Sequence, residues 1–581
     1  MNPLLYLFER LWGKKGSALQ LIATAPVAAL LPLLVSCAGQ VAPSGGPPDR
    51  VPPAIVRTTP DTNAVRVSTN EIVLEFDKYV DRRTVEESIF ISPYLGDLEF
   101  AWSGREVTVM FTRPLRPRTT YVVNVGTDVV DLRERNRMSS GFTLAFSTGD
   151  SIDQGSIAGQ VYDDRPEGVM IFAYQLDQID KDTLNPASAK PDFIMQSGQQ
   201  GRFRLSNLPL GLFRLFAVRD EYRNLVYDRE VDQIGMASTD VALRLEGPHV
   251  DGIPFRLSKE DTTRPFVTGA VALHRQEVDV RLNESLDSTR LDNTGASVSD
   301  TTGGGEVPVL ATYWKHTQPP TLGVILGVPL DSSGIYRVRV RGAFDRAGNP
   351  LNPENAGATF EGTGRRDTTL VHLSISGIRD STRGVLPEAA LELEFSEPVL
   401  REPLKKGIQL LDSVGRPTGF GYRWEGAARV AIQPQHPLWP SAWYALAVRL
   451  DSVLDLRGRR YVDSLWRVRF QTLDLKKTGE IAGSVGDARG GKAGYVVSAE
   501  SIDRSERQTR TTRLERAGPF VLGRVTEGKY AISGFEDSDG DGKYSFGTPF
   551  PFHPAERYAV AADTVRVRAR WGIEGVLLRF K

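Results

Sequence analysis

The sequence contains few of the residues from which reactive sites are usually built. Its 581 residues include one cysteine and six histidines. A single cysteine excludes an intramolecular disulfide framework and any cysteine-rich zinc or iron–sulfur site. The spacing of the histidines excludes a zinc site built from a local histidine pair and disfavours one assembled from distant loops. The six stand at positions 249, 274, 316, 372, 436 and 553.

A basic excess and catalytic motifs are missing as well. The 71 basic residues balance 72 acidic ones, which argues against a general binder of nucleic-acid phosphates. No nucleophile elbow, phosphate-binding loop, dinucleotide fingerprint or metalloprotease motif occurs. Carboxylate pairs such as Glu75 with Asp77, or Glu394 with Glu397, could serve acid–base hydrolysis. Carboxylates on a solvent-facing strand edge more often keep a protein soluble, so the sequence predicts no catalytic residue and no enzyme.

The first forty residues have the composition of an export signal. Lys14 and Lys15 precede an apolar stretch that runs from about residue 18 to residue 35. A basic flank followed by a short apolar region is typical of a secretory signal peptide. Pro26 and Pro32 lie within this stretch and would break a spanning helix, so a permanent transmembrane anchor is disfavoured.

The lone cysteine ends this segment. Leu34-Val35-Ser36-Cys37 resembles the bacterial lipobox. The resemblance implies a lipoprotein signal peptide over residues 1–36, cleavage before Cys37 and acylation of Cys37 with palmitate-like chains, which hold a soluble body on a bilayer. Ala38 stands where an inner-membrane retention signal would place Asp, so the resemblance implies the outer membrane. The alternative is a plain signal peptide with an incidental cysteine.

The rest of the chain is patterned for strands. Residues 37–53 are rich in Gly, Pro and Ser and predict a flexible tether. Beyond them, short alternating runs such as residues 71–76 and 336–340 recur between turn residues, with no long helical period. This spacing predicts an all-β fold of β-sandwiches.

One unit of about one hundred residues occurs three times. Each copy has a strand, a tryptophan, a Pro-Leu pair, a tyrosine six residues after that Leu, an acidic turn and a closing strand with a phenylalanine. The landmarks are Trp102, Trp314 and Trp424; Leu115, Leu330 and Leu438; Tyr121, Tyr336 and Tyr444; Asp131, Asp345 and Asp455; and Phe146, Phe360 and Phe470. The fixed spacing predicts sandwiches with buried Trp and Tyr. These segments resemble bacterial Ig-like domains of S-layer proteins and of Bacteroidetes cell-envelope lipoproteins.

A second unit occurs twice, at residues 155–159 onward and residues 479–483 onward. Its later landmarks keep an offset of 317, as in Phe203 and Phe520 or Asp220 and Asp537. Both copies resemble carboxypeptidase regulatory-like domains, which implies small prealbumin-type β-sandwiches without catalysis.

The repeats predict five tandem domains in an elongated array. The predicted ranges are an Ig-like domain over 54–150, a regulatory-like domain over 151–260, Ig-like domains over 261–366 and 367–475, and a regulatory-like domain over 476–581. The polar stretch 286–305 is predicted to be a flexible inserted loop of the third domain.

One segment has the pattern of a metal site. Asp537, Asp539 and Asp541 alternate with Ser and Gly, as in the first half of a calcium loop. Thr548 stands where an EF-hand has its bidentate Glu, so a Ca²⁺ site and a metal-free Asp/Gly turn remain alternatives, with the turn favoured. No cofactor is otherwise required. Nearby aromatic residues are expected to form either a contact patch or a packed loop, with the packed loop favoured; they are Tyr544, Phe546, Phe550 and Phe552.

These patterns together predict a lipid-anchored, non-enzymatic envelope protein that docks to a protein complex at the outer membrane. The rival interpretation is a carbohydrate-binding or polysaccharide-processing protein, which would need an exposed aromatic platform or a cleft with two opposed carboxylates. A structural surface-layer component is a second alternative.

Overall fold

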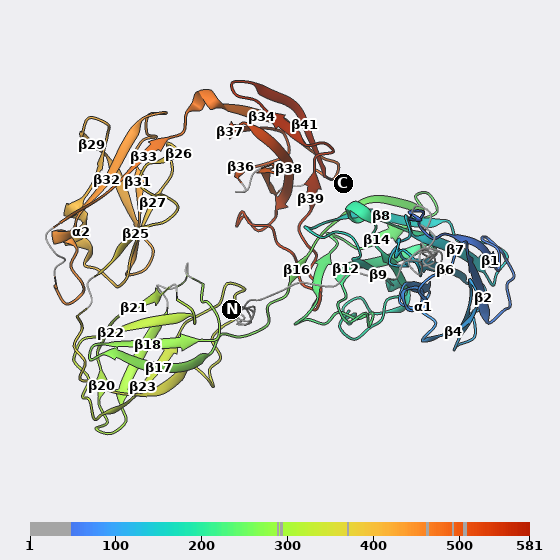
Figure 1. The fold of residues 1–581 in the computed structure, drawn as a ribbon, viewed down its shortest axis with the longest axis horizontal. Coiled ribbons are helices and arrows are strands. Elements are labelled where there is room, and N and C mark those ends of the chain that lie inside the picture. Colours follow the sequence, from blue (N-terminus) through green and yellow to red (C-terminus); the bar gives the residue numbers. More distant parts are fainter. Residues whose placement is uncertain are drawn as a thin grey trace, which may run out of the picture. The chain divides into compact units, whose positions relative to one another are not determined.

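The computed structural model describes residues 48–580, apart from residues 288–289, 291–293, 316, 369–370, 460–463, 491–492 and 504–507. The all-β prediction is confirmed: the described strands form ten sheets, and each successive stretch of chain supplies two of them. Figure 1 shows these sheets in chain order. We name the five pairs the first to fifth modules, using the predicted ranges. No described helix is long and apolar enough to cross a membrane.

The first module is a sandwich of two antiparallel sheets, β1-β2-β5-β4 and β3-β6-β7. Alternate residues of β2 and β5 are buried in one core between the sheets, as the period-two pattern predicts. The elements are β1 Ile55–Thr59, β2 Glu71–Phe76, α1 Arg82–Glu86, β3 Ile89–Ser92, β4 Leu98–Ser103, β5 Glu106–Phe111, β6 Thr120–Val125 and β7 Phe142–Ser147.

The second module has a large sheet that is apolar on both faces. The inner face packs against the sheet β11-β8-β15, and the outer face holds a second apolar cluster. Consecutive residues of strands β9 and β12 are accordingly buried, instead of buried residues alternating with exposed ones. The strands are β8 Gly155–Tyr162, β9 Met170–Gln175, β10 Phe193–Gln196, β11 Arg202–Leu208, β12 Gly211–Arg219, β13 Gln233–Met236, β14 Val241–Leu243, β15 His249–Arg256 and β16 Ser258–Lys259.

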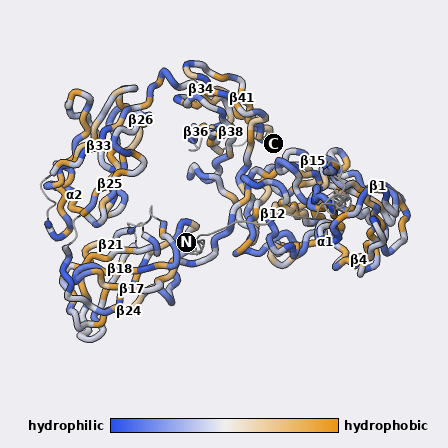
Figure 2. The backbone as a smooth tube through the Cα atoms, in the orientation of Figure 1, coloured by the Kyte–Doolittle hydropathy of each residue, from blue (hydrophilic) through white to orange (hydrophobic). Residues whose placement is uncertain are grey.

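The third module repeats the two-sheet plan, with sheets β17-β18-β22-β21 and β20-β19-β23-β24. The hydropathy of its strands alternates along the chain, most plainly in β18 and β23 (Figure 2). The strands are β17 Val267–His274, β18 Glu277–Leu282, β19 Gly295–Asp300, β20 Glu306–Val307, β21 Val309–Lys315, β22 Thr321–Leu326, β23 Ile335–Arg341 and β24 Gly357–Glu361.

The predicted inserted loop 286–305 is partly wrong. Residues 295–300 form β19, which pairs in register with β23 from Gly295 opposite Arg341 to Asp300 opposite Tyr336. The Ser, Gly and Asp content of this segment predicts a loop, because these residues have low strand propensity. Its backbone nevertheless pairs with β23. Only Val298 of this strand is fully buried in the core.

The fourth and fifth modules follow the same two plans. The fourth has sheets β25-β27-β31-β30 and β26-β33-β32-β28-β29, and the fifth has sheets β37-β34-β41 and β36-β35-β38-β39, with β40 on β38. The fourth comprises β25 Leu373–Ile375, β26 Thr382–Val385, β27 Leu391–Phe395, α2 Arg401–Gly407, β28 Ile408–Leu411, β29 Pro417–Thr418, β30 Phe420–Trp424, β31 Arg429–Pro434, β32 Trp443–Arg449 and β33 Leu465–Thr472. The fifth comprises β34 Thr478–Asp487, β35 Gly494–Ser501, β36 Thr509–Leu514, β37 Pro519–Thr526, β38 Gly528–Asp537, β39 Tyr558–Val560, β40 Val565–Val567 and β41 Gly572–Phe580.

Four short 3₁₀ turns connect described strands: Leu176–Gln178, Gln199–Gly201, Leu450–Ser452 and Leu475–Lys477.

Candidate functional site

Of the predicted site residues, Cys37 lies outside the described residues. Its acylation therefore stays a prediction. The other predicted residues, the three aspartates of the fifth module, lie in the described part and come together.

Asp537, Asp539 and Asp541 form one group at the end of β38. One carboxylate oxygen of each lies within 4.8 Å of the others, with Asp537 buried and the other two exposed. The same carboxylates accept backbone hydrogen bonds: Asp541 N–H donates to Asp539 at 3.0 Å, and Lys543 N–H donates to Asp541 at 2.6 Å. Such bonds are typical of an Asx turn and use the oxygens that a metal would need.

Two further side chains fix this loop. The Glu556 carboxylate is buried and accepts hydrogen bonds from the Ser538 N–H at 2.7 Å and the Ser545 N–H at 3.0 Å. The Arg513 guanidinium lies 3.5 Å from Asp537 and would touch a Cβ added at Gly542. Arg513 thus supplies positive charge where a cation would bind, and this geometry favours the metal-free turn.

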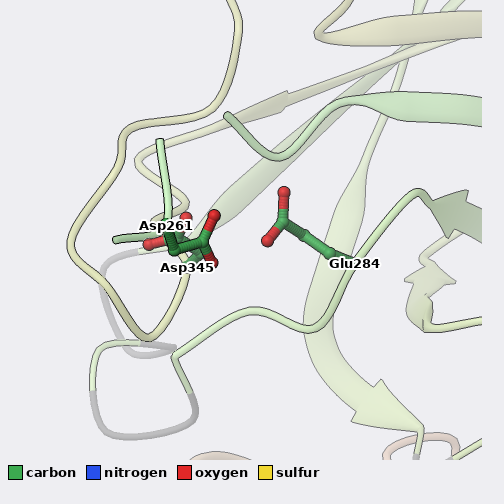
Figure 3. A group of neighbouring side chains, drawn as sticks. All are labelled: Asp261, Glu284 and Asp345. Atoms are coloured by element: carbon green, nitrogen blue, oxygen red, sulfur yellow. The ribbon is translucent and has the colours of Figure 1, made fainter. Parts of the chain in front are cut away.

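A second carboxylate group, which sequence reasoning missed, lies at the start of the third module. Oxygens of Asp261, Glu284 and Asp345 lie within 4.8 Å of one another, and Figure 3 shows the Glu284 carboxylate directed toward the two aspartates. Burial and the charges of both aspartates raise the pKa of Glu284, although a hydrogen bond from Asn283 opposes this. Three carboxylates at this distance can coordinate a hard cation such as Ca²⁺.

The fourth module contains the equivalent three residues, Asp367, Glu397 and Asp455. There, two arginines fill the space between the carboxylates. Arg457 lies 3.2 Å from Asp367 and 3.3 Å from Glu397, and Arg459 pairs with Asp367 and lies 2.6 Å from Asp455. The expectation that Glu397 faces solvent is wrong: it is 6% exposed, because it continues the inward alternation of Leu391, Leu393 and Phe395 past the end of β27.

The equivalence of these positions is fixed by the backbone. In each of the three modules, the side chain of the residue before the Glu or Lys position accepts a hydrogen bond from a backbone N–H at the beginning of that module. Each turn aspartate forms a β-bridge with the residue two positions after the Glu or Lys. The acceptors are Asp77 from Ala54 N–H (2.9 Å), Asn283 from Phe266 N–H (2.7 Å) and Ser396 from His372 N–H (2.8 Å). The bridges join Val80 with Asp131, Leu286 with Asp345 and Val399 with Asp455. The first module has Lys78 where the other two have Glu.

In the described structure the fourth-module group continues into the third module. His274 Nε2 lies 3.2 Å from Asp367 and 2.9 Å from Glu277. Glu277 also accepts hydrogen bonds, each 2.6 Å long, from Tyr313 Oη and Lys315 Nζ. Although burial opposes it, these donors lower the pKa of Glu277 to about 2. An apolar contact of Tyr313 and Ile325 with Ala428 lies in the same junction.

The aromatic residues of the fifth module form a packed loop that also contacts another module. Tyr544 packs edge-on against Phe535, with ring centres 5.8 Å apart. Phe552 instead packs against Phe216 of the second module, 5.9 Å away, and the Arg214 guanidinium lies 3.8 Å from its ring. These aromatic residues therefore form both a packed loop and a contact patch. The patch contacts the outer face of the second module's large sheet.

Three tryptophans stand at the repeat positions and pack on the cores of their modules, but they are half-buried instead of buried as the repeats predict: Trp102, Trp314 and Trp424. Trp439 and Trp571 are instead 79% and 71% exposed. Exposed indoles are candidates for stacking on a ligand.

A cavity of about 590 Å³ with a mostly apolar lining borders the first and second modules. Its walls include the amides of Asn124 and Gln196, and the charged side chains of Arg204 and Asp251. Arg204 lies 2.9 Å from Asp251, so both charges are paired within the cavity wall. The Asn124 amide donates to the Ile194 carbonyl oxygen at 3.0 Å and the Gln196 amide donates to Asp128 at 3.2 Å, so these groups are also bonded within the protein.

Residues 49–148 match the family model of the bacterial Ig-like domain. The predicted Ig-like character is confirmed for this first module. No curated protein matches the chain.

Several solved structures are similar, all at low identity. The N-terminal part of the bacterial S-layer protein SbsC is 12% identical, covers 36% of this chain and 44% of its own, and has a TM-score of 0.16. L,D-transpeptidase 1 of Mycobacterium tuberculosis is 12% identical, covers 26% and 78%, and has a TM-score of 0.15. SGBP-B of the Bacteroides ovatus mixed-linkage glucan utilization locus, in complex with a heptasaccharide, is 11% identical, covers 62% and 81%, and has a TM-score of 0.16. The chain thus spans less than half of the S-layer structure, and TM-scores of this size support no functional argument.

Proposed function

We propose that the chain is a lipid-anchored, non-enzymatic scaffold of the bacterial cell envelope, held on the outer membrane through Cys37 and docking to a protein complex there. The observation that carries this proposal is the succession of β-sandwich modules behind a lipobox-like segment. Repeated sandwiches offer loops and sheet edges to a macromolecule, and function in such modules lies in these surfaces.

The buried charges fit a scaffold better than an active site. The acidic residues of the fourth module are paired with Arg457 and Arg459, and Glu277 is paired with Lys315. A hydrolase would need a carboxylate that faces a substrate in a cleft, whereas Glu277, Glu397 and Asp455 are buried. Here the same groups join neighbouring parts of the chain.

The anchor is tested by replacing Cys37 with Ser in the native host. We expect the variant to fold normally and to leave the membrane fraction, because a signal peptide without an acylated cysteine provides no lipid. Replacing Ser36 with Ala, which keeps a small residue before the cysteine, should leave membrane attachment intact. Attachment of the Cys37→Ser variant as firm as that of the wild type would contradict the anchor.

The docking role is tested by affinity purification of the native lipoprotein after cross-linking in intact membranes. We expect one envelope protein complex to be recovered in stoichiometric amount with the wild type. Recovery of no stoichiometric partner would contradict docking while leaving the anchor in place.

A second candidate function is glycan binding, which the exposed Trp439 and Trp571 favour. Indole rings stack on the apolar faces of sugars, and both of these rings are accessible to solvent. A glycan array with the full chain tests this, with Trp439→Ala and Trp571→Ala compared with Leu245→Ala. Leu245 is 85% exposed and serves as a control for loss of surface apolar area. Binding that both Trp variants retain would exclude these residues as a platform.

A further inference from the structure

Among the described residues, the junction between the third and fourth modules contains more buried acid than base. Five described carboxylates lie in one connected group with three described permanent cations. The carboxylates are those of Glu277, Asp279, Asp367, Glu397 and Asp455, and the cations are Lys315, Arg457 and Arg459. His274 links the two halves of the group between Glu277 and Asp367. Since an unbalanced buried charge is costly, such a group favours the uptake of a proton.

The best-paired carboxylates do not hold this proton. Glu277 accepts three hydrogen bonds of 2.6–2.9 Å, from His274, Tyr313 and Lys315. Asp279 lies 2.6 Å from Lys315 and is 20% exposed. Asp455 lies 2.6 Å from Arg459 and accepts two backbone N–H groups.

Glu397 is the carboxylate with the weakest partners. Its contacts are Arg457 at 3.3 Å and Arg459 at 3.6 Å. Arg457 lies slightly nearer to Asp367, at 3.2 Å. Arg459 lies nearer to both Asp367 and Asp455 than to Glu397. It also faces the negative charges of Glu277, Asp367 and Asp455. Burial, followed by these charges, raises the pKa of Glu397 from 4.5 to about 7.

We propose that docking of the third module on the fourth is linked to protonation of Glu397, so that the junction is firm in mildly acidic solution and loosens as the pH rises past neutrality. The proton sits on the Glu397 carboxyl, which is neutral in the docked state, and leaves to solvent when the junction opens. The apolar contact of Tyr313 with Ala428 opens with it. This property is independent of any lipid anchor or partner.

The direction of the pH dependence follows from the linkage between proton binding and docking. Opening the junction takes the negative charge of Glu277 and the cover of the third module away from Glu397, while the carboxylates and arginines of its own module stay. The pKa of Glu397 is therefore lower in the open state than the docked value of about 7, and the docked junction binds more protons between these two values. The stabilisation is lost as the pH rises through about 7. Glu277, whose pKa is lowered to about 2, does not titrate in this window. Within it the docking equilibrium constant falls by at most about tenfold for each pH unit.

The test is hydrogen–deuterium exchange on the full chain between about pH 5 and pH 8, corrected for the intrinsic pH dependence of exchange. Peptides covering residues 309–326 and 427–434 report on the junction, and a peptide covering residues 155–175 of the second module serves as reference. We expect junction protection in the wild type to fall with pH relative to the reference. In Glu397→Gln, which carries a neutral side chain of the same shape, protection should stay high and independent of pH.

Two control variants show whether Glu397 or another titrating group controls the junction. Glu402→Gln removes a carboxylate that is 76% exposed in the same module and should behave as the wild type. His274→Gln removes the imidazole of the junction and should keep the wild-type fall. A flat profile in His274→Gln, or an unchanged fall in Glu397→Gln, would overturn the proposal.

A measurement on the wild type alone covers the case in which Glu397→Gln fails to fold. Infrared difference spectra across the same pH range should show the carbonyl band of one buried protonated carboxylic acid disappearing near pH 7. Exposed carboxyl groups lose their protons near pH 4 and do not contribute there. Absence of this band at about pH 5.5 would also overturn the proposal.

Discussion

The backbone N–H of Asp331 donates a 2.8 Å hydrogen bond to the hydroxyl of Tyr336, five residues later. The same bond occurs in the first and fourth modules, from Arg116 to Tyr121 at 2.7 Å and from Trp439 to Tyr444 at 3.0 Å. Each tyrosine also stacks on the phenylalanine of the closing strand. The fixed Leu-to-Tyr spacing therefore has a cause: the residue after Leu must present its N–H to the hydroxyl.

Replacing Tyr336 with Phe removes this acceptor while keeping the ring. We expect the free energy of unfolding of the third module to fall by about 1 kcal/mol, because the Asp331 N–H loses its partner. Urea unfolding of the full chain, followed by exchange of third-module peptides, measures the change. Tyr222→Phe is the control, since Tyr222 is 65% exposed. Equal effects of the two variants would contradict a structural role for the bond.

The second and fifth modules share a close approach at a glycine. A Cβ added at Gly159 would lie 2.0 Å from the Ile253 carbonyl oxygen, and one added at Gly483 would lie 2.1 Å from that of Val576. Both would also meet a phenylalanine ring, Phe203 or Phe520. The matching Gly and Phe of the two copies are thus a packed pair.

Gly483→Ala should destabilise the fifth module by about 1–3 kcal/mol, because the parallel pairing of β34 with β41 must shift to admit the methyl group. Gly523→Ala in β37 is the matched control, since nothing lies within 4 Å of its added Cβ. Thermal unfolding of both variants measures the difference. A Gly523→Ala variant that melts lower than Gly483→Ala would contradict this account.

The sequence predicted the parts of the fold that depend on side-chain alternation and repeat landmarks. Strands β2, β18 and β27 alternate as expected, and Tyr121 and Phe146 are buried as the repeats require. It missed β19, whose register depends on backbone pairing with a distant strand. It also missed the burial of Glu397. The residue continues the alternation of Leu393 and Phe395, but a carboxylate at such a position was expected to face solvent.

Of the candidate sites, only the one contiguous in sequence was predicted. Asp537, Asp539 and Asp541 alternate along one loop, whereas Asp261, Glu284 and Asp345 are brought together from three separate loops. A usable signal existed in the repeats, since Asp-Thr-Thr begins both the third and the fourth module, at residues 261–263 and 367–369. Recognising it requires aligning the modules from their first residue.

The three carboxylates of the third module should repel one another. Glu284→Lys introduces the residue type that Lys78 provides at the equivalent position of the first module, and we expect the melting temperature of the third module to rise. A gain of about 0.5–1 kcal/mol is reasonable for replacing repulsion by attraction at a partly exposed site. Glu361→Lys, at an exposed position of β24, is the control. A lower melting temperature in Glu284→Lys than in the wild type would contradict uncompensated repulsion among the carboxylates. If calcium raised the melting temperature of the wild type but not that of Glu284→Lys, a bound cation would be balancing the repulsion.

The Asp-rich loop of the fifth module should not depend on calcium. Its carboxylates accept backbone N–H groups, and Arg513 supplies the positive charge. We therefore expect exchange protection of residues 537–547 in the full chain to be the same in calcium and in chelator. If chelator reduced that protection in the wild type but not in Asp541→Asn, the calcium-loop alternative would be correct. Asp503→Asn, which alters a carboxylate elsewhere in the fifth module, is the control.

Lys315 is the main cation of the buried Glu277 carboxylate, and the two side chains are 14% and 5% exposed. Lys315→Met keeps the aliphatic length but leaves Glu277 with only His274 and Tyr313 as partners. Removing one member of a buried pair typically costs about 3–5 kcal/mol, and we expect a loss of that order in the free energy of unfolding at neutral pH.

The pH dependence of this loss has a definite sign. Because the pKa of Glu277 is lowered to about 2 from an ordinary 4.5, its pairing stabilises the junction above about pH 4.5, and the stabilisation is lost as the pH falls through about 2. The difference between the wild type and Lys315→Met should therefore shrink on acidification below about pH 4. Lys405→Met, which removes an exposed pair with Glu402, should change stability by less than about 1 kcal/mol at any pH. A Lys315→Met penalty that stayed constant down to about pH 2 would mean that the lysine acts through packing of its chain and not through its charge.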